Sequence, residues 1–262
     1  MKILVCVKQV PETNSIVKID GSKKWVEADM HSAFRTSRFD EYAVEEALRI
    51  REAVPGAVVD AITAGPDRAK EVLRRAMGMG ADGGIHILTD DRGYVSPFTT
   101  AARIAAVAGK RKYDLILTGI MSEDEAQGQV GPMVAEMLGL PCATAVVSLK
   151  ISSGSRPVYV EREIEGGCRD CLEIRLPALL TVQAGINRPR YPSLSNVMRA
   201  NKAELKIFDA GGLAVDGGRQ RAAGAEAARR TRDALFLEGT REEKAAELLK
   251  ILKEKQLVKT SK

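Results

Sequence analysis

One stretch of the chain, residues 113–133, combines residue types that could bind a small anionic ligand. It reads YDLILTGIMSEDEAQGQVGPM, an apolar run followed by a loop of carboxylates, amides and small residues. The run Leu115-Ile116-Leu117 predicts a buried parallel strand, and the residues from Met133 onward have helical spacing. In an open α/β sheet, ligands bind beyond the carboxyl ends of the strands, where helix N-termini present free N–H groups to anions. The stretch therefore predicts a nucleotide site, the alternative being a solvated connection without a ligand.

Catalytic chemistry, in contrast, has no motif in this sequence. There is no G-x-S-x-G elbow, no H-E-x-x-H and no Walker A lysine loop, and Lys8-Gln9-Val10-Pro11 follows the first strand in place of a glycine-rich fingerprint. His86 lies in a strand-like run, which indicates a hydrogen-bonded core residue. The carboxylates at 123–125 could bind Mg²⁺, bond a ribose or remain solvated. We therefore predict a chain that has no catalytic residues of its own and is not an enzyme.

The four cysteines favour neither a disulfide framework nor a metal site. Cys168 and Cys171 form a C-x-x-C pair, but zinc usually needs a second pair or histidines at ligand spacing. Cys6 and Cys142 lie in apolar, strand-like runs. The net charge of +5 comes without a long Lys/Arg run, which argues against nucleic-acid binding. Since no signal peptide precedes the first strand and no apolar run approaches membrane-spanning length, we expect a cytoplasmic protein without membrane insertion.

Apolar periodicity predicts alternating strands and helices through the first 150 residues, and therefore a mostly parallel sheet. The predicted strands are 3–7, 58–63, 84–88, 115–118 and 143–149, and the predicted helices are 40–53, 69–77, 97–107 and 131–138. Strands at 158–163, 168–176 and 178–182 would form an antiparallel or mixed extension of the same sheet. The predicted fold class is α/β, a doubly wound sheet with an antiparallel extension and a C-terminal helical arm.

The C-terminal third has a different character. A basic segment at 188–206 contains two prolines, which favour an extended loop, and Ser195 could cap a short helix over 196–203. Residues 209–230 are rich in Gly, Ala and Arg and predict a linker. An amphipathic helix is expected over 241–255, with an apolar face that needs a surface to dock on.

Seven motifs occur in order and at the separations found in one known family. They are KILVCVKQVPE, FDEYAVEEALRI, TAGP, RRAMGMGADGGIHI, GIMSEDEAQGQVGPM, VEREIEGG and RYPSLSNVMRANK. Together they make the chain resemble the β subunit of electron transfer flavoprotein over essentially its whole length. The resemblance implies a heterodimer in which an α subunit holds most of the FAD contacts. It also implies electron flow from dehydrogenases, typically acyl-CoA dehydrogenases, to a membrane-associated quinone oxidoreductase.

The resemblance further implies that this subunit binds an AMP that is not redox-active. The matching positions are Cys6, Ser37, Arg38, Phe39, Asp40, Ala64, Gly119, Ser122, Asp124, Gly128, Gln129 and Val130. Small residues at Cys6 and Ala64 leave room for an adenine, and N–H groups at 128–130 can hold a phosphate at a helix N-terminus. Family members often have Asn and Thr at Gly128 and Val130, so phosphate binding here would depend more on the backbone.

A partner-recognition loop is implied at 188–202, with Leu194 as its anchor. The matching partner-binding residues are Tyr191, Leu194, Asn196 and Met198. A leucine on a proline-flanked loop, surrounded by basic side chains, is built like a small hot spot with a charged rim. The alternative is that Leu194 packs under its own loop. The implied organisation is a nucleotide-binding domain over 1–206, followed by a linker and an arm over 207–262 that docks on the partner subunit.

Two other functions remain open at this point. One branch of the family binds a second FAD in this subunit and bifurcates electrons using NADH, and Val10–Thr13 and Gln129–Pro132 partly resemble that branch. The helix opening Phe39–Ala43 resembles the AMP branch, which we favour. A stand-alone adenine-nucleotide sensor would fit the α/β pattern but leaves 188–206 and 241–255 without a role. An adenylating enzyme lacks its Ser-Gly-Gly loop.

Overall fold

The computed structural model describes residues 1–15, 17–28, 32–90, 93–151, 157–213, 215, 220–227 and 234–258. The chain divides into two compact units, 1–225 and 226–262. Each unit is described by itself.

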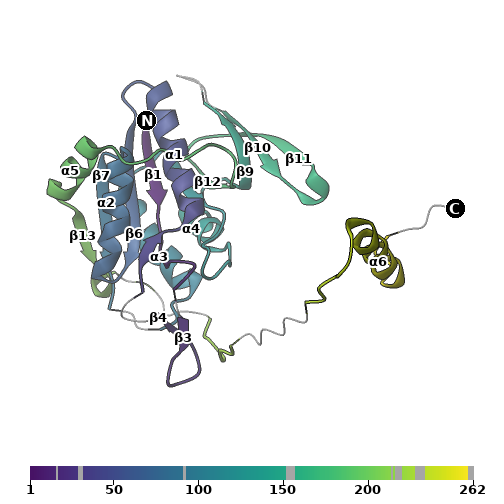
Figure 1. Ribbon diagram of the computed structural model, residues 1–262. Helices are drawn as coiled ribbons and strands as arrows, with labels where there is room; N and C mark the ends of the chain where they lie inside the picture. Colours follow the sequence, from purple (N-terminus) through teal and green to yellow (C-terminus); the bar gives the residue numbers. More distant parts are fainter. Residues whose placement is uncertain are drawn as a thin grey trace. The chain divides into compact units, whose positions relative to one another are not determined.

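The first unit is built on a nine-stranded sheet (Figure 1). Across the sheet the strands follow the order β11-β10-β9-β12-β8-β1-β6-β7-β13, and those from β9 to β13 pair in parallel. Their bounds are β1 Lys2–Cys6, β6 Val58–Gly65, β7 Gly83–Leu88, β8 Leu115–Gly119, β9 Cys142–Lys150, β12 Ala178–Val182 and β13 Lys206–Asp209. β10 (Val158–Glu163) and β11 (Arg169–Ile174) extend the sheet in antiparallel pairing. The predicted α/β sheet with its antiparallel extension is confirmed, but the strand at 178–182, which was predicted in that extension, lies in parallel pairing between β9 and β8.

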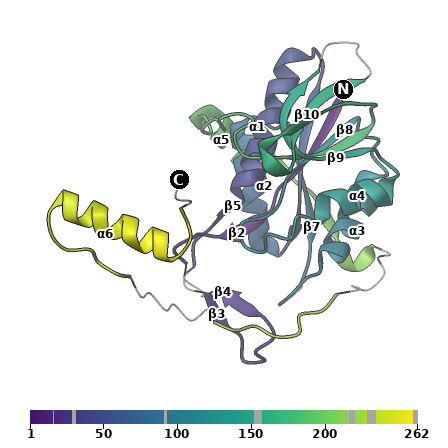
Figure 2. The ribbon, with the colours of Figure 1, turned by 90° about the vertical axis from the view of Figure 1, so that its right-hand side faces the viewer.

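Helices cover both faces of this sheet. The helices are α1 Arg38–Ala53, α2 Lys70–Met79, α3 Pro97–Ala108 and α4 Val130–Leu138. Alternate residues of β1 enter different cores: Ile3 and Val5 pack with α1 and α2, whereas Leu4 and Cys6 pack with α3 and α4. This is the period-2 alternation of a strand buried on both sides. Figure 2 shows α1 and α2 on one side of the sheet and α3 and α4 on the other.

Several short elements have no signal in the sequence. β2 (Gln9–Pro11) pairs with β5 (Phe34–Thr36), and β3 (Val17–Ile19) pairs with β4 (Val26–Ala28). Three residues are too few to show a period, so only pairing partners reveal them. The edge strand β13 was likewise not predicted: it begins at the last residue of the basic segment and ends at the first residue of the predicted linker. Single 3₁₀ turns occur at η1 Asp67–Ala69, η2 Glu165–Gly167 and η3 Ala210–Gly212.

Helix α5 spans Leu194–Lys202 and begins two residues before the predicted helix over 196–203. Its N-cap is Ser193, whose extended backbone (ψ 149°) lets the side-chain oxygen accept from the Asn196 N–H. The predicted cap at Ser195 is therefore wrong, because Ser195 lies inside the first turn. A proline at 192 ends the preceding extended segment and sets the helix to begin after Ser193.

The second unit contains helix α6 (Arg241–Glu254), close to the predicted 241–255. A capping box starts it: the Thr240 side chain accepts from Glu243 N, and the Glu243 carboxylate accepts from Thr240 N at 2.7 Å. Leu248 and Leu249 are each almost half exposed. The docking of this arm on a partner subunit stays a prediction.

All four cysteines are free thiols. Cys6 is buried at the end of β1 and Cys142 is exposed at the start of β9, so both lie in strands as the sequence predicted. Cys168 and Cys171 are also exposed, with Cys171 in strand β11. Within the described ranges, no group of three or more His, Cys, Asp or Glu residues could hold a metal ion. The same residues include no helix long and apolar enough to cross a membrane.

Candidate functional site: a crevice at the carboxyl edge of the sheet

The crevice lies where the chain changes from one face of the sheet to the other. β1 and β8 are neighbours, yet the helix that follows β1 along the chain, α1, covers one face, and the helix that follows β8, α4, covers the other. At such a switch point the connections leave in opposite directions, and open α/β sheets bind their ligands there, beyond the carboxyl ends of the strands. We call this place, at the ends of β1 and β8, the crevice. The residues expected to bind a nucleotide lie at the ends of β1, β6 and β8, and in the segments that follow β1 and β8.

Asp40 holds the two sides of this edge together. Its Oδ1 accepts from the Gly119 N–H at 3.0 Å, at the end of β8, and its Oδ2 accepts from the Lys8 N–H at 2.8 Å, just after β1. The side chain is buried, and burial raises its pKa to about 7. Asp40 therefore acts first as a structural bridge across the switch point, a role that spacing in the sequence did not show.

Cys6 lines the floor of the edge as a neutral group. Burial, followed by the negative charge of Asp40, raises the pKa of the Cys6 thiol above its ordinary value. A protonated, buried thiol behaves as a small apolar side chain. Ala64 is placed two residues beyond Ile62, the register partner of Cys6, and belongs to the same α3–α4 core. The two small residues that the sequence selected thus lie on adjacent strands.

The acidic loop after β8 is fully engaged by cations from the other side of the edge. The Lys8 ammonium lies 2.9 Å from Asp124 and 3.2 Å from Glu125. Arg35 of β5 lies 2.8 Å from Glu123, which also accepts from the Arg38 N–H at 3.0 Å. These pairs neutralise the carboxylates, which weakens the Mg²⁺ reading of 123–125 and removes most of the negative charge that would repel a phosphate.

The loop ends at the N-terminus of α4. Gln129 is the N-cap residue, with α4 beginning at Val130, so the first turn leaves N–H groups without intrahelical acceptors. Gly128 has φ +64°, a conformation that favours glycine. A Cβ on Gly131 would lie 2.8 Å from the side chains of both Thr118 and Thr181, so the helix start sits directly against β8 and β12.

Ser37 supplies a buried polar atom with no protein partner. The residue is fully buried at the N-cap of α1, but its hydroxyl makes no capping bond, and within the described residues it has no hydrogen-bond partner. Buried hydroxyls in native proteins normally find a partner, often water or a ligand. Three features would fit an adenine nucleotide: this hydroxyl, the small side chains of Cys6 and Ala64, and the free N–H groups at the start of α4.

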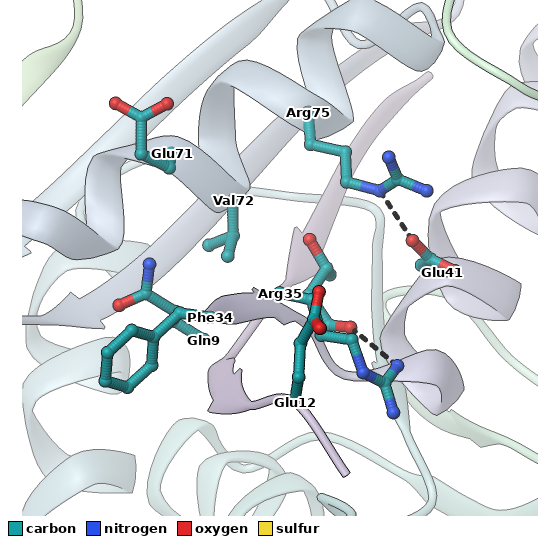
Figure 3. Close-up of a pocket in the computed structure, with 9 residues that line it drawn as sticks. Gln9, Glu12, Phe34, Arg35, Glu41, Glu71, Val72 and Arg75 are labelled. Atoms are coloured by element: carbon teal, nitrogen blue, oxygen red, sulfur yellow. Dashed lines mark hydrogen bonds and ion pairs between the residues drawn. The ribbon is translucent and has the colours of Figure 1, made fainter. Parts of the chain in front are cut away.

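A second hollow lies beside the crevice and shares none of its predicted residues. This cavity of 460 Å³ is formed by β2, β5 and the N-terminal parts of α1 and α2 (Figure 3). Figure 3 shows the ion pair between Arg75 and Glu41, 2.6 Å, along one wall. Glu12, the residue that follows β2, lines the same hollow.

The predicted partner loop is exposed. Tyr191 is 91% exposed, Leu194 77% and Met198 56%. The alternative in which Leu194 packs under its own loop is therefore wrong, because helix α5 begins at Leu194 and turns its side chain outward. Asn196 is half-buried on the same helix. The predicted partner residues lie together on one short segment, whereas the predicted nucleotide residues come from four separate parts of the chain.

Comparison with known proteins decides the family. The profile of the electron transfer flavoprotein domain matches residues 25–212. The electron transfer flavoprotein subunit beta of Dictyostelium discoideum is 36% identical over 216 residues, which is 82% of this chain and 84% of that protein. The chain belongs to the electron transfer flavoprotein family, as a β subunit.

Other family members extend the match. The subunit beta of Thermoanaerobacterium thermosaccharolyticum is 39% identical over 220 residues, covering 82% of this chain and 81% of its own length. That of Methylophilus methylotrophus is 32% identical over 266 residues, covering 97% and 98%. This last match extends into the C-terminal arm of the present chain, so the Methylophilus methylotrophus protein has a corresponding C-terminal segment.

Lys8 and Arg35 were not among the residues predicted for the site, whereas the carboxylates at 123–125 with which they pair lie in the predicted loop. Each of these two cations lies more than 80 positions from the loop carboxylate with which it pairs, and nothing local marks the two as partners. The only sequence signal for these pairs is complementary charge in the segments that follow β1 and β8. These two strands are neighbours in the sheet, so their carboxyl ends meet at one edge.

Proposed function

We propose that this protein binds AMP at the switch-point crevice and, with an α subunit, forms the FAD site of a one-FAD electron carrier. The observation that carries the proposal is the neutralised, small-residue crevice next to the free N–H groups of α4. Cys6 and Ala64 offer an apolar place for the adenine. The Ser37 hydroxyl offers a hydrogen bond to it or to the ribose. Backbone groups of Gly128 to Val130 would hold the phosphate.

FAD supplies the redox chemistry when it is bound. This chain's own contribution would be to orient and shield one side of the flavin, with the segment 11–14 and the adjoining cavity as the nearest elements. Electron transfer requires short distances and excluded water more than acid–base groups. That requirement agrees with a site whose charged residues are paired with one another.

The donor proteins would dock on the segment that carries Tyr191, Leu194 and Met198. Exposed aromatic and aliphatic side chains with a basic rim are typical of small hot spots. We propose flavin dehydrogenases of the acyl-CoA dehydrogenase type as donors and a membrane quinone oxidoreductase as acceptor. Cytoplasm is the proposed compartment, although one relative, from Arabidopsis thaliana, is named as mitochondrial.

The first experiment measures the adenine cofactors of the co-expressed heterodimer, released by acid and quantified against protein. We expect one AMP and one FAD per heterodimer. Two FAD and no AMP would reject the proposal and favour the bifurcating alternative, for which NADH oxidation would then be assayed. Purification without any larger flavin-bearing subunit would favour the stand-alone nucleotide sensor.

A second experiment tests the docking role. Leu194→Ala should raise the apparent KM for a reduced acyl-CoA dehydrogenase about tenfold, which corresponds to roughly 1.4 kcal/mol, and leave the FAD content unchanged. The exposed Leu235, which lies in the second unit, provides a matched leucine-to-alanine control. Unchanged kinetics at subsaturating dehydrogenase would exclude Leu194 as an anchor.

A further inference from the structure

The segment that presents the exposed docking side chains is fixed to the rest of the domain by an unusual set of contacts. Residues 187–203 cross the outer ends of α1 and α2, and Figure 1 shows α5 beside α2. α5 and α2 form one of the larger helix–helix contacts in the unit. We call this stretch the docking segment.

The start of the docking segment is held by α1. The Arg190 guanidinium donates to both oxygens of Glu45, at 2.8 and 2.9 Å, and to Glu52 at 2.6 Å. Glu45 is buried, so this pair is little screened by solvent. Asn187 donates from its amide to the Tyr42 carbonyl at 3.0 Å. Tyr191, the next residue after Arg190, therefore starts from a fixed backbone position.

The end of the docking segment and the end of α2 cap each other. Arg74 of α2 donates to the carbonyls of Ala200 and Ala203 at the C-terminus of α5. Arg199 of α5 donates to the carbonyls of Met77 and Ala81 at the C-terminus of α2, at 3.1 and 3.2 Å. Each arginine thus donates to carbonyls at the C-terminal end of the other helix and places a positive charge at its negative end.

Between these two fixed ends, the docking segment rests on a glycine. Gly78 lies inside α2 and is buried, and a Cβ added there would lie 3.2 Å from Pro192 Cβ and 3.4 Å from Val197 Cγ2. Pro192 and Val197 flank Leu194 on either side. The missing side chain at Gly78 therefore sets how closely the docking segment can approach α2, and with it where Leu194 stands.

We propose that Gly78 and the reciprocal caps of Arg74 and Arg199 are positioning residues for partner docking. The end of α2 serves as a platform that pre-orders the docking segment, so that little conformational entropy is lost when a donor protein binds. The proposal rests on the docking role proposed above. It adds that the position of the exposed docking side chains is set by contacts between the docking segment and α2, which involve no partner protein.

Gly78→Ala separates this role from stability. Alanine is favoured over glycine inside a helix, so a purely structural reading predicts an unchanged or higher melting temperature and unchanged kinetics. Our proposal predicts that the docking segment shifts by a few tenths of an ångström. The apparent KM for a reduced acyl-CoA dehydrogenase should then rise between about threefold and tenfold at unchanged kcat. The matched control is Gly212→Ala, where a Cβ would meet nothing within 4 Å.

Hydrogen exchange of the heterodimer gives a readout that needs no partner. Amides of 191–198 should exchange faster in Gly78→Ala and in Arg199→Gln, whereas those of β1 and β8 should exchange as before. Exchange unchanged in both variants would overturn the proposal, as would unchanged KM for Gly78→Ala in an assay where Leu194→Ala raises KM. If Leu194→Ala itself has no effect, the docking role fails, and the exchange data alone decide whether α2 positions the segment.

Discussion

The tightest approach in the crevice predicts a large effect of one methyl group at Gly119. A Cβ at this position would lie 2.6 Å from Asp40 Oδ1, 2.6 Å from Phe39 Cβ and 2.8 Å from the Phe39 carbonyl carbon. Ordinary carbon contacts begin near roughly 3.5 Å, so the start of α1 would have to move about 1 Å away from β8. Gly119→Ala would therefore separate the two elements that Asp40 bridges.

The magnitude has two parts. Overpacking in a well-packed site costs about 1–3 kcal/mol. Moving Asp40 also breaks its bond from the Gly119 N–H, 3.0 Å, and hydrogen bonds to charged groups contribute about 1.5–3 kcal/mol. We expect the free energy of unfolding to fall by about 3–5 kcal/mol, a large fraction of the 5–15 kcal/mol typical of folded proteins.

Urea unfolding of the purified chain, followed by circular dichroism, measures this loss, and Gly212→Ala is the control in an open position. AMP content of the corresponding heterodimer should fall in parallel, because Phe39 and Asp40 line the same edge. A loss below about 0.5 kcal/mol, the size expected for an ordinary surface substitution, would refute the reasoning that the switch-point edge is rigid.

Two further substitutions test buried polar groups. Burial raises the pKa of Asp40 to about 7 from an ordinary 3.8, so the folded chain binds this proton more tightly than the unfolded chain does. The free energy of unfolding should therefore decrease between about pH 4 and pH 7, and Asp40→Asn should remove that part of the slope; an identical slope in the variant would contradict the assignment. The buried Tyr113 hydroxyl donates to Asp60 at 2.7 Å, so Tyr113→Phe should cost about 1.5–3 kcal/mol in urea unfolding, whereas Tyr191→Phe, at an exposed position, should cost nothing measurable.

Long periodic elements were predictable from the sequence for a physical reason. A strand buried on both faces needs a continuous apolar run, such as Leu115 to Leu117 in β8, and a helix such as Arg38–Ala53 must place its apolar residues on one side. The strands of three residues, β2 to β5, and the edge strand β13 carry no such pattern. These residues become strands because the fold places another strand next to each of them.

The candidate site divides in the same way. The sequence indicated the loop after β8 and the small residues Cys6 and Ala64, since residue size and chain position after a strand are local properties. It could not show that Lys8 pairs with Asp124 and Arg35 with Glu123, because such contacts depend on which strands are neighbours.

By itself, the sequence determined the fold class, the family and the position of the docking segment in the chain. Tertiary structure alone decided that Asp40 bridges β1 and β8, that Leu194 faces outward, and that Gly78 lies beneath Pro192. The reason is that hydrophobic period and residue size are written along the chain. Ion pairs, close approaches and exposure arise only when distant segments are packed against one another.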